Sequence, residues 1–202
     1  MTNNSIMLRD SWFVEDSKAV KIWKDETLSK LVGIPVYIYR PKIQPCPIRG
    51  AFAVPEFDVI MIPADWRLSE LWDIMGLGML YHEVGHLRDP EAANLPYYQK
   101  GSTIVGYAAS DVAHFGKKAI RSEAAADRFA CLHGYAINLY NFLCEVLRRK
   151  ERLGGSLIGD IPDRIKRIEH YIRTGEYPIA DALDHLPTIQ EMNICDRMLL
   201  NI

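Results

Sequence analysis

The sequence predicts an α+β fold in which a small antiparallel sheet packs on one helix, beside a second long helix. Three observations support this prediction. Short runs of β-branched and aromatic residues lie in the first third of the chain. After Pro63 the apolar residues recur at steps of three and four instead, as they do on one face of a helix. No linker rich in Pro, Gly or Ser divides the 202 residues, so we expect one domain spanning residues 1–202.

The first third of the chain is expected to form a helix followed by three strands. Apolar pairs three residues apart, among lysines and acids, predict a helix over residues 16–31 that ends at Gly33. Strands are predicted over residues 36–39, 51–54 and 59–62, which prolines and a turn-like segment separate. Together these short strands predict the antiparallel sheet.

Two long helices are expected after the strands. The first carries residues at steps of four and three, which places them on one continuous helix face: Leu68, Trp72, Met75, Met79, His82 and His86. The second spans residues 118–151 and has Glu123 and Asp127 on one stripe. Another apolar stripe predicts that this second helix is largely buried: Phe129, Leu132, Ala136, Leu139, Leu143 and Val146. A shorter helix near Pro162 and a last one beyond Pro187 complete the prediction.

Charge and cysteine usage narrow the class of protein. A net charge of −2 gives no argument for nucleic acid or an anionic membrane surface, so neither is expected as a partner. The four cysteines form no C-x-x-C pair in a chain too long for a disulfide scaffold, which favours reduced thiols. No basic region followed by an apolar run opens the sequence, so no secretory signal is expected. These features predict a soluble, cytoplasmic protein.

The central motif is H-E-V-G-H at residues 82–86. Histidines four residues apart on a helix project side by side, so His82 and His86 can bind one metal ion. Glu83 would lie near a water molecule on that metal, where a carboxylate can act as a general base. Two imidazoles and a carboxylate suit zinc better than magnesium or calcium. The alternative is a pair of core histidines that hydrogen-bond to acidic neighbours.

Glu123 and Asp127 are the candidates to complete this site. Two carboxylates on the inner face of a buried helix are costly unless a cationic group lies opposite. The metal ion and its histidines would supply that group, with Glu123 as third ligand and Asp127 accepting the outer N–H of a ligand histidine. The alternative is a solvated pair in contact with Arg121 and Arg128.

The two motifs together resemble those of the gluzincin metallopeptidases, in particular a small soluble form of the HtpX and CAAX-prenyl-protease group. The matching strings are H-E-V-G-H and E-A-A-A-D-R-F-A, which begins at Glu123. The resemblance implies a zincin-like fold and a zinc ion held by His82, His86 and Glu123, with Asp127 supporting a histidine. It also implies hydrolysis of peptide bonds in a peptide or protein partner.

The resemblance extends upstream of the H-E-V-G-H motif. The sequence also differs from the family in two respects. Residues 49–54, R-G-A-F-A-V, are similar to the family's N-A-F-A strand, and this implies a strand that pairs with extended substrate: Ala51, Phe52 and Ala53. The transmembrane helices of the large family members have no counterpart here. In the family pattern H-P-x-x-x-x-R-I, Ile161 replaces the histidine that is a candidate for stabilising the transition state. Three residues could substitute for it or be ordinary structural residues: His133, His170 and Tyr171.

The function expected from these residues is zinc-dependent peptide hydrolysis in which Glu83 activates a water molecule. Two alternatives remain open. The chain could be a regulatory protease that cuts one partner, such as a repressor, or a non-catalytic binding domain stabilised by zinc. The intact Glu83 argues against the binding domain, because a purely structural zinc site favours four closed ligands.

The segment beyond Pro187 carries an apolar stripe with a thiol, and two roles are open for it. Cys195 could bind zinc at its open position and keep the enzyme latent. Alternatively, the segment is one more core-packing helix and Cys195 is a buried thiol.

Overall fold

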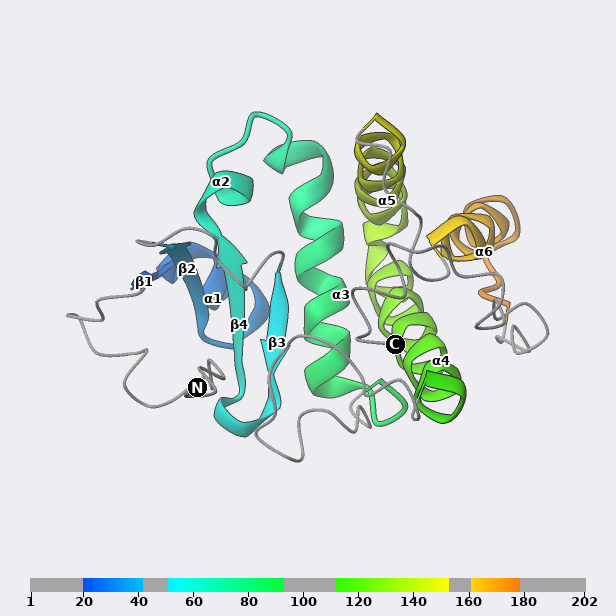
Figure 1. The fold of residues 1–202 in the computed structure, drawn as a ribbon, viewed down its shortest axis with the longest axis horizontal. Coiled ribbons are helices and arrows are strands. Elements are labelled where there is room, and N and C mark those ends of the chain that lie inside the picture. The colour runs from blue at the N-terminus through cyan, green and yellow to red at the C-terminus, as the bar shows by residue number, and fades with distance from the viewer. Residues whose placement is uncertain (1–19, 42–50, 93–111, 153–160, 179–202) are drawn as a thin grey trace, which may run out of the picture.

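The computed structural model describes residues 20–41, 51–92, 112–152 and 161–178. The strands are β1 (Val20–Lys24), β2 (Val36–Pro41), β3 (Phe52–Val54) and β4 (Val59–Pro63). The helices are α1 (Glu26–Val32), α2 (Ala64–Arg67), α3 (Leu77–Arg88), α4 (Val112–Ala130), α5 (Ala136–Arg152) and α6 (Ile161–Thr174). The sheet lies on one side of α3 and the later helices lie on the other, so the predicted α+β class is confirmed (Figure 1).

The sheet is mixed, and the prediction of an antiparallel sheet is wrong for its central pair. The strand order is β1-β2-β4-β3. β1 pairs with β2 and β3 pairs with β4 in antiparallel fashion, but β2 and β4 run parallel, with Val36 opposite Ile60. The hairpin of β3 and β4 therefore joins β2 through its second strand. This leaves β3 at an edge of the sheet.

The predicted helix over residues 16–31 begins only at Glu26, because residues 20–24 form β1. Asp25 separates the two elements: its side chain accepts a hydrogen bond from the Leu28 amide at 3.0 Å, which caps α1. Gly33, with φ of 69°, ends α1 where the sequence predicts. Five residues of β1 pair with β2, and this long-range pairing decides a segment whose local apolar spacing also fits a helix.

The first long helix is interrupted, so the prediction of one continuous helix is wrong at its N-terminal half. α2 ends at Arg67, a π-helical turn covers Trp72–Gly76, and α3 follows directly. The intervening turn forms at Ser69, whose carbonyl accepts from the Trp72 amide at 3.0 Å and whose hydroxyl accepts from the Leu71 amide at 3.2 Å. These local bonds compete with helical ones. Leu68 consequently lies outside the α3 face and is 67% exposed.

The second long helix also bends, at a π-helical turn over Cys131–Tyr135 between α4 and α5. Gly134 has φ of 91° there, a conformation that glycine adopts without steric cost. The bend rotates one end of the predicted stripe relative to the other. Leu139 and Leu143 are buried as predicted, whereas Leu132 is 64% exposed.

Helix α3 is the centre of the packing. Its Leu80 and Val84 belong to one core cluster with apolar residues of β2 and β4: Val36, Ile38, Ile60 and Ile62. On the other side, a Cβ added to Gly85 would lie 2.8 Å from Cα of Ala126, so α3 and α4 are in backbone contact there. A Cβ at Gly78 would lie 2.1 Å from the backbone nitrogen of Leu139, which brings α5 equally close. Small residues thus position α4 and α5 beside the H-E-V-G-H motif.

The remaining predictions concern α6, membrane-spanning helices, the cysteines and the tail. α6 begins beside Pro162, as predicted. In the described ranges, no helix is both long enough and apolar enough to cross a membrane. Cys131 and Cys144 are free thiols. The tail beyond Pro187, with Cys195, lies outside the described residues.

Candidate metal centre

The structure brings His82, His86 and Glu123 together, as the sequence predicts. Both histidines are buried on α3, and Glu123 projects toward them from α4. Nε2 of His82 lies 3.2 Å from Nε2 of His86. Glu123 places Oε2 at 3.3 Å from the first nitrogen and Oε1 at 3.5 Å from the second. One ligand atom from each residue therefore lies close to one shared point.

The spacing of these atoms fits a zinc ion. Ligands arranged tetrahedrally at about 2.1 Å from zinc are separated from one another by about 3.4 Å. The two histidine nitrogens, 3.2 Å apart, are near that separation, and each has one oxygen of the Glu123 carboxylate at a similar distance, Oε2 at 3.3 Å from His82 and Oε1 at 3.5 Å from His86. The donor set of two imidazole nitrogens and one carboxylate is also one that zinc accepts, with a fourth position left for water.

Asp127 contacts the second ring nitrogen of His82, Nδ1. Oδ1 of Asp127 lies 2.7 Å from Nδ1 of His82, and the carboxylate is fully buried. An N–H on Nδ1 that donates to Asp127 leaves the lone pair of Nε2 for a metal ion. The structure therefore places Asp127 where the sequence predicts. Without a metal ion at Nε2, burial lowers the pKa of His82, but hydrogen bonds with Asp127 and Glu123 outweigh burial and raise the pKa to about 10.

Arg164 of α6 is a member of this centre that sequence reasoning missed. Its Nε and Nη2 donate to Asp127 at 2.8 and 2.7 Å. Its Nη1 lies 2.7 Å from Oε2 of Glu123. Burial would raise the pKa values of both carboxyl groups, yet the guanidinium keeps that of Glu123 well below its usual range and also lowers that of Asp127. The cost of two carboxylates on the inner face of a helix was the available signal, but the sequence argument assigned the cationic partner to the metal ion and its histidines.

The Nδ1 atom of His86 has different partners, a serine hydroxyl and a backbone carbonyl. Its Nδ1 lies 3.3 Å from the hydroxyl oxygen of Ser122 and 3.4 Å from the carbonyl oxygen of Ala92. The hydroxyl of Ser122 also donates to that carbonyl. Ser122 directly precedes Glu123 and is buried. Sequence reasoning missed this serine, although its position beside a candidate ligand on the same helix could have indicated it.

Glu83 is buried beside the ligand group without being part of it. Its Oε2 accepts a hydrogen bond from the backbone amide of Ala53 at 2.8 Å. This bond links the candidate base to β3, the edge strand that contains two of the three predicted substrate-pairing residues, Phe52 and Ala53. Ala51 directly precedes β3 and is half-buried. Because Glu83 occupies the amide of Ala53, an added peptide strand would have to use other groups of this edge.

Among the described residues, the His-His-Glu ligand group includes none of the three candidates for replacing the family histidine. His133 is exposed and stacks on Phe129 at 4.0 Å between ring centroids. His170 is exposed on α6, and Tyr171 faces Tyr177 with ring centroids 6.4 Å apart. The additional cationic side chain that the structure places at the ligand group is Arg164.

The fold and the site thus define an α+β protein with a His-His-Glu group that could hold a metal ion. Compared with known protein families, with curated proteins and with solved structures, the chain gives no match. A functional interpretation therefore depends on the site geometry and the motifs.

Proposed function

We propose that this chain is a zinc-dependent peptidase in which His82, His86 and Glu123 hold the metal and Glu83 activates water. The observation that carries the proposal is that His82, His86 and Glu123 each offer a ligand atom within 4.8 Å of the others, with the two histidine Nε2 atoms 3.2 Å apart. Those atoms account for three positions of a tetrahedral site, which is the arrangement of hydrolytic rather than structural zinc. The resemblance to the HtpX and CAAX-prenyl-protease group, and with it a zincin-like fold, belongs to the same proposal.

Different residues of the chain would have different roles in the reaction. A bound zinc ion would polarise the scissile carbonyl group and make water acidic enough to attack it near neutral pH. Glu83 takes a proton from the attacking water and passes it to the departing amine. The amide of Ala53 keeps the Glu83 carboxylate oriented, at 2.8 Å. Asp127 keeps the Nδ1 proton on His82.

A non-catalytic role is the second candidate, and one observation favours it. Arg164 bonds to both Glu123 and Asp127, so part of their negative charge is compensated even without a metal ion. A domain of this kind would keep its fold after metal removal and would hydrolyse nothing.

The test is metal analysis and cleavage of a peptide library by the wild-type protein and Glu83→Gln. Glu83→Gln should bind about one zinc per chain, as the wild type does, because Glu83 is not a ligand. Its hydrolysis should fall at least about 100-fold, the range lost with a general base. Glu70→Gln, at an exposed position before α3, is the matched control and should cleave normally. Equal turnover by Glu83→Gln would refute the assignment of the base, and a chelator-insensitive wild type would refute the metal mechanism.

A further inference from the structure

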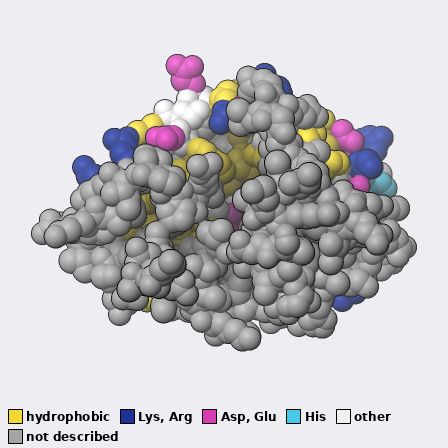
Figure 2. Space-filling model, in the orientation of Figure 1, with side chains coloured by type: hydrophobic (Ala, Val, Ile, Leu, Met, Phe, Trp, Pro, Cys, Tyr) yellow, Lys and Arg dark blue, Asp and Glu magenta, His cyan; other side chains and the backbone are white. Residues whose placement is uncertain are grey.

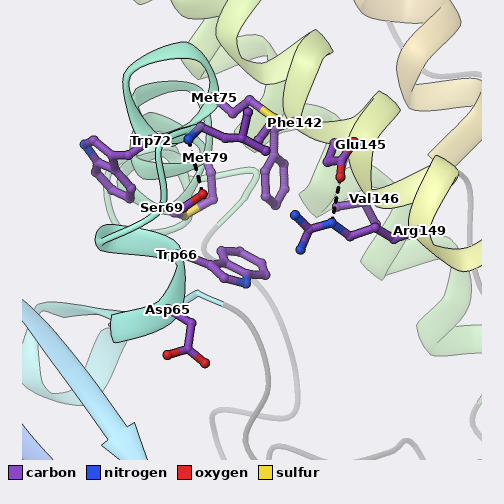
Figure 3. Close-up of a pocket in the computed structure, with 12 residues that line it drawn as sticks. Asp65, Trp66, Ser69, Trp72, Met75, Met79, Phe142, Glu145, Val146 and Arg149 are labelled. Carbon is purple, nitrogen blue, oxygen red and sulfur yellow. Dashed lines mark hydrogen bonds and ion pairs between the residues drawn. The ribbon is translucent and has the colours of Figure 1, made fainter.

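A cavity of about 560 Å³ opens between α2, the π-helical turn before α3, and α5 (Figure 3). Its volume falls in the range of about 300–1,000 Å³ that is usual for pockets that bind small organic groups. Apolar side chains form most of its wall: Trp66, Trp72, Met75, Met79, Phe142 and Val146. None of these residues belongs to the candidate metal centre.

Two residues that line the cavity, Met75 and Met79, lie on the helix face that carries the metal ligands. Met79 lines the cavity and precedes His82 by three residues, which is about 4.5 Å along a helix. Met75 lines it further away, seven residues before His82 or about 10 Å. In the hollow over α3, hydrophobic side chains lie beside an acidic one (Figure 2). A peptide that crosses the metal centre along α3 would therefore reach the cavity.

The chemistry of the wall selects an uncharged, apolar occupant. Trp66 and Phe142 meet edge to face, with ring centroids 5.2 Å apart. The charges at one side largely cancel, because Nε of Arg149 lies 2.7 Å from Oε1 of Glu145 (Figure 3). Aromatic and methionine side chains favour large hydrophobic groups that bury much area. Of the charged lining residues, Asp65 and Arg149 are exposed, so a charged occupant in contact with the apolar part of the wall would lose its hydration there.

We propose that this cavity receives one large apolar side chain of the peptide substrate, aromatic or aliphatic. An extended peptide advances about 3.3 Å per residue, so the distances above place this side chain within about three residues of the scissile bond. The inference depends on the proposed peptidase function and adds to it a substrate class: peptides with a bulky hydrophobic residue at one fixed position.

The experiment compares two tryptophan substitutions on α5. Val146→Trp places a large ring in the cavity, whereas Ile137→Trp places the same ring at a position that is 63% exposed. Cleavage-site profiling of the wild type should show one position, within three residues of the cut, that prefers Phe, Tyr, Trp, Leu or Met over Ala at least about 10-fold in kcat/KM. Val146→Trp should abolish that preference by lowering kcat/KM for the bulky peptides toward the value for the Ala peptide. Ile137→Trp should keep the wild-type profile.

Failure of the inference can be distinguished from failure of the proposed function. If the wild type cleaves peptides without this preference, or Val146→Trp retains it while folded, the cavity is not a substrate pocket although the peptidase proposal stands. If the wild type cleaves nothing, the peptidase proposal fails, and the same Phe and Ala peptides are titrated against it by intrinsic tryptophan fluorescence. At least about 10-fold tighter binding of the Phe peptide, lost in Val146→Trp, then supports the pocket. Equal binding of the two peptides overturns it.

Discussion

Asp127 is a single buried carboxylate that contacts both a candidate metal ligand and a buried cation. It lies 2.7 Å from Nδ1 of His82 and accepts two hydrogen bonds from Arg164. Asp127→Asn should keep the shape of this side chain but remove its charge, so His82 would be held less firmly. We expect zinc affinity to fall about 10–100-fold, the usual cost of losing a partner of a metal-bound histidine. Competition with a chromophoric chelator measures this change.

The control for Asp127→Asn is Asp73→Asn, the same substitution at an exposed position. It should bind zinc as the wild type does. If Asp127→Asn loses all zinc while Glu123→Gln keeps it, the two carboxylates have exchanged the roles assigned here.

Local helix geometry explains which site residues the sequence could predict. His82 and His86, like Glu123 and Asp127, are four residues apart on one helix, so spacing alone fixes their common direction. Arg164 is 37 residues from Asp127 along the chain and reaches it only through the packing of α6. No spacing rule predicts such a contact. Asp127 thus had a second partner that the sequence argument did not anticipate.

The turn between β3 and β4 is tied to the end of α3 by a two-point ion pair. Arg88 places Nη1 at 2.6 Å and Nη2 at 2.8 Å from the two carboxylate oxygens of Asp58. Asp58→Asn would break the charge pair and still tolerate φ of 50° at this position. The free energy of unfolding should fall by no more than about 1 kcal/mol at pH 7, because the pair is exposed. Urea denaturation measures this loss.

The effect of Asp58→Asn should depend on pH. The hydrogen bond with Arg88 lowers the pKa of Asp58 below its ordinary value of 3.8. The pair therefore contributes its full stability above that value and loses it as pH falls through the lowered pKa. Wild type and variant should differ at pH 7 and converge in more acidic solution. A difference of the same size at both ends of this range would contradict the assignment.

At the level of elements, the sequence predicts the helices and strands that local residue patterns determine. It misses the element that depends on pairing with a distant strand. β2, β3 and β4 lie where short runs of β-branched and aromatic residues predict them. β1 was missed because the apolar spacing around it fits a helix as well, and only pairing with β2 distinguishes the two. The π-helical turns at Trp72–Gly76 and Cys131–Tyr135 also escaped prediction. Each of these turns lies next to an α-helix, at a point where the apolar stripe in the sequence continues without a break. The stripe therefore gives no sign of the turn.

Across the whole molecule, the candidate ligands come from two helices, so a metal ion would cross-link α3 to α4. An ion that binds only the folded chain stabilises it by about 2.7 kcal/mol at a free concentration 100 times its Kd. For a chain of this size we expect zinc to raise Tm by about 5–10 °C. Calorimetry with zinc and with chelator measures the shift.

Two histidine variants test that stabilisation. His86→Ala removes a ligand and should abolish the rise in Tm along with bound zinc. His133→Ala, at an exposed position outside the ligand group, should keep both. A rise that persists in His86→Ala would show that zinc acts at another place.

The order of the ligand-bearing helices also bears on how the protein is made. His82 and His86 are synthesised before Glu123, and Arg164 follows later still. At about 5–20 residues per second, several seconds separate the second histidine from Glu123 on the ribosome. During that interval the nascent chain carries the H-E-V-G-H motif without its third ligand. The growing polypeptide therefore passes this stage before it can assemble the three-residue centre.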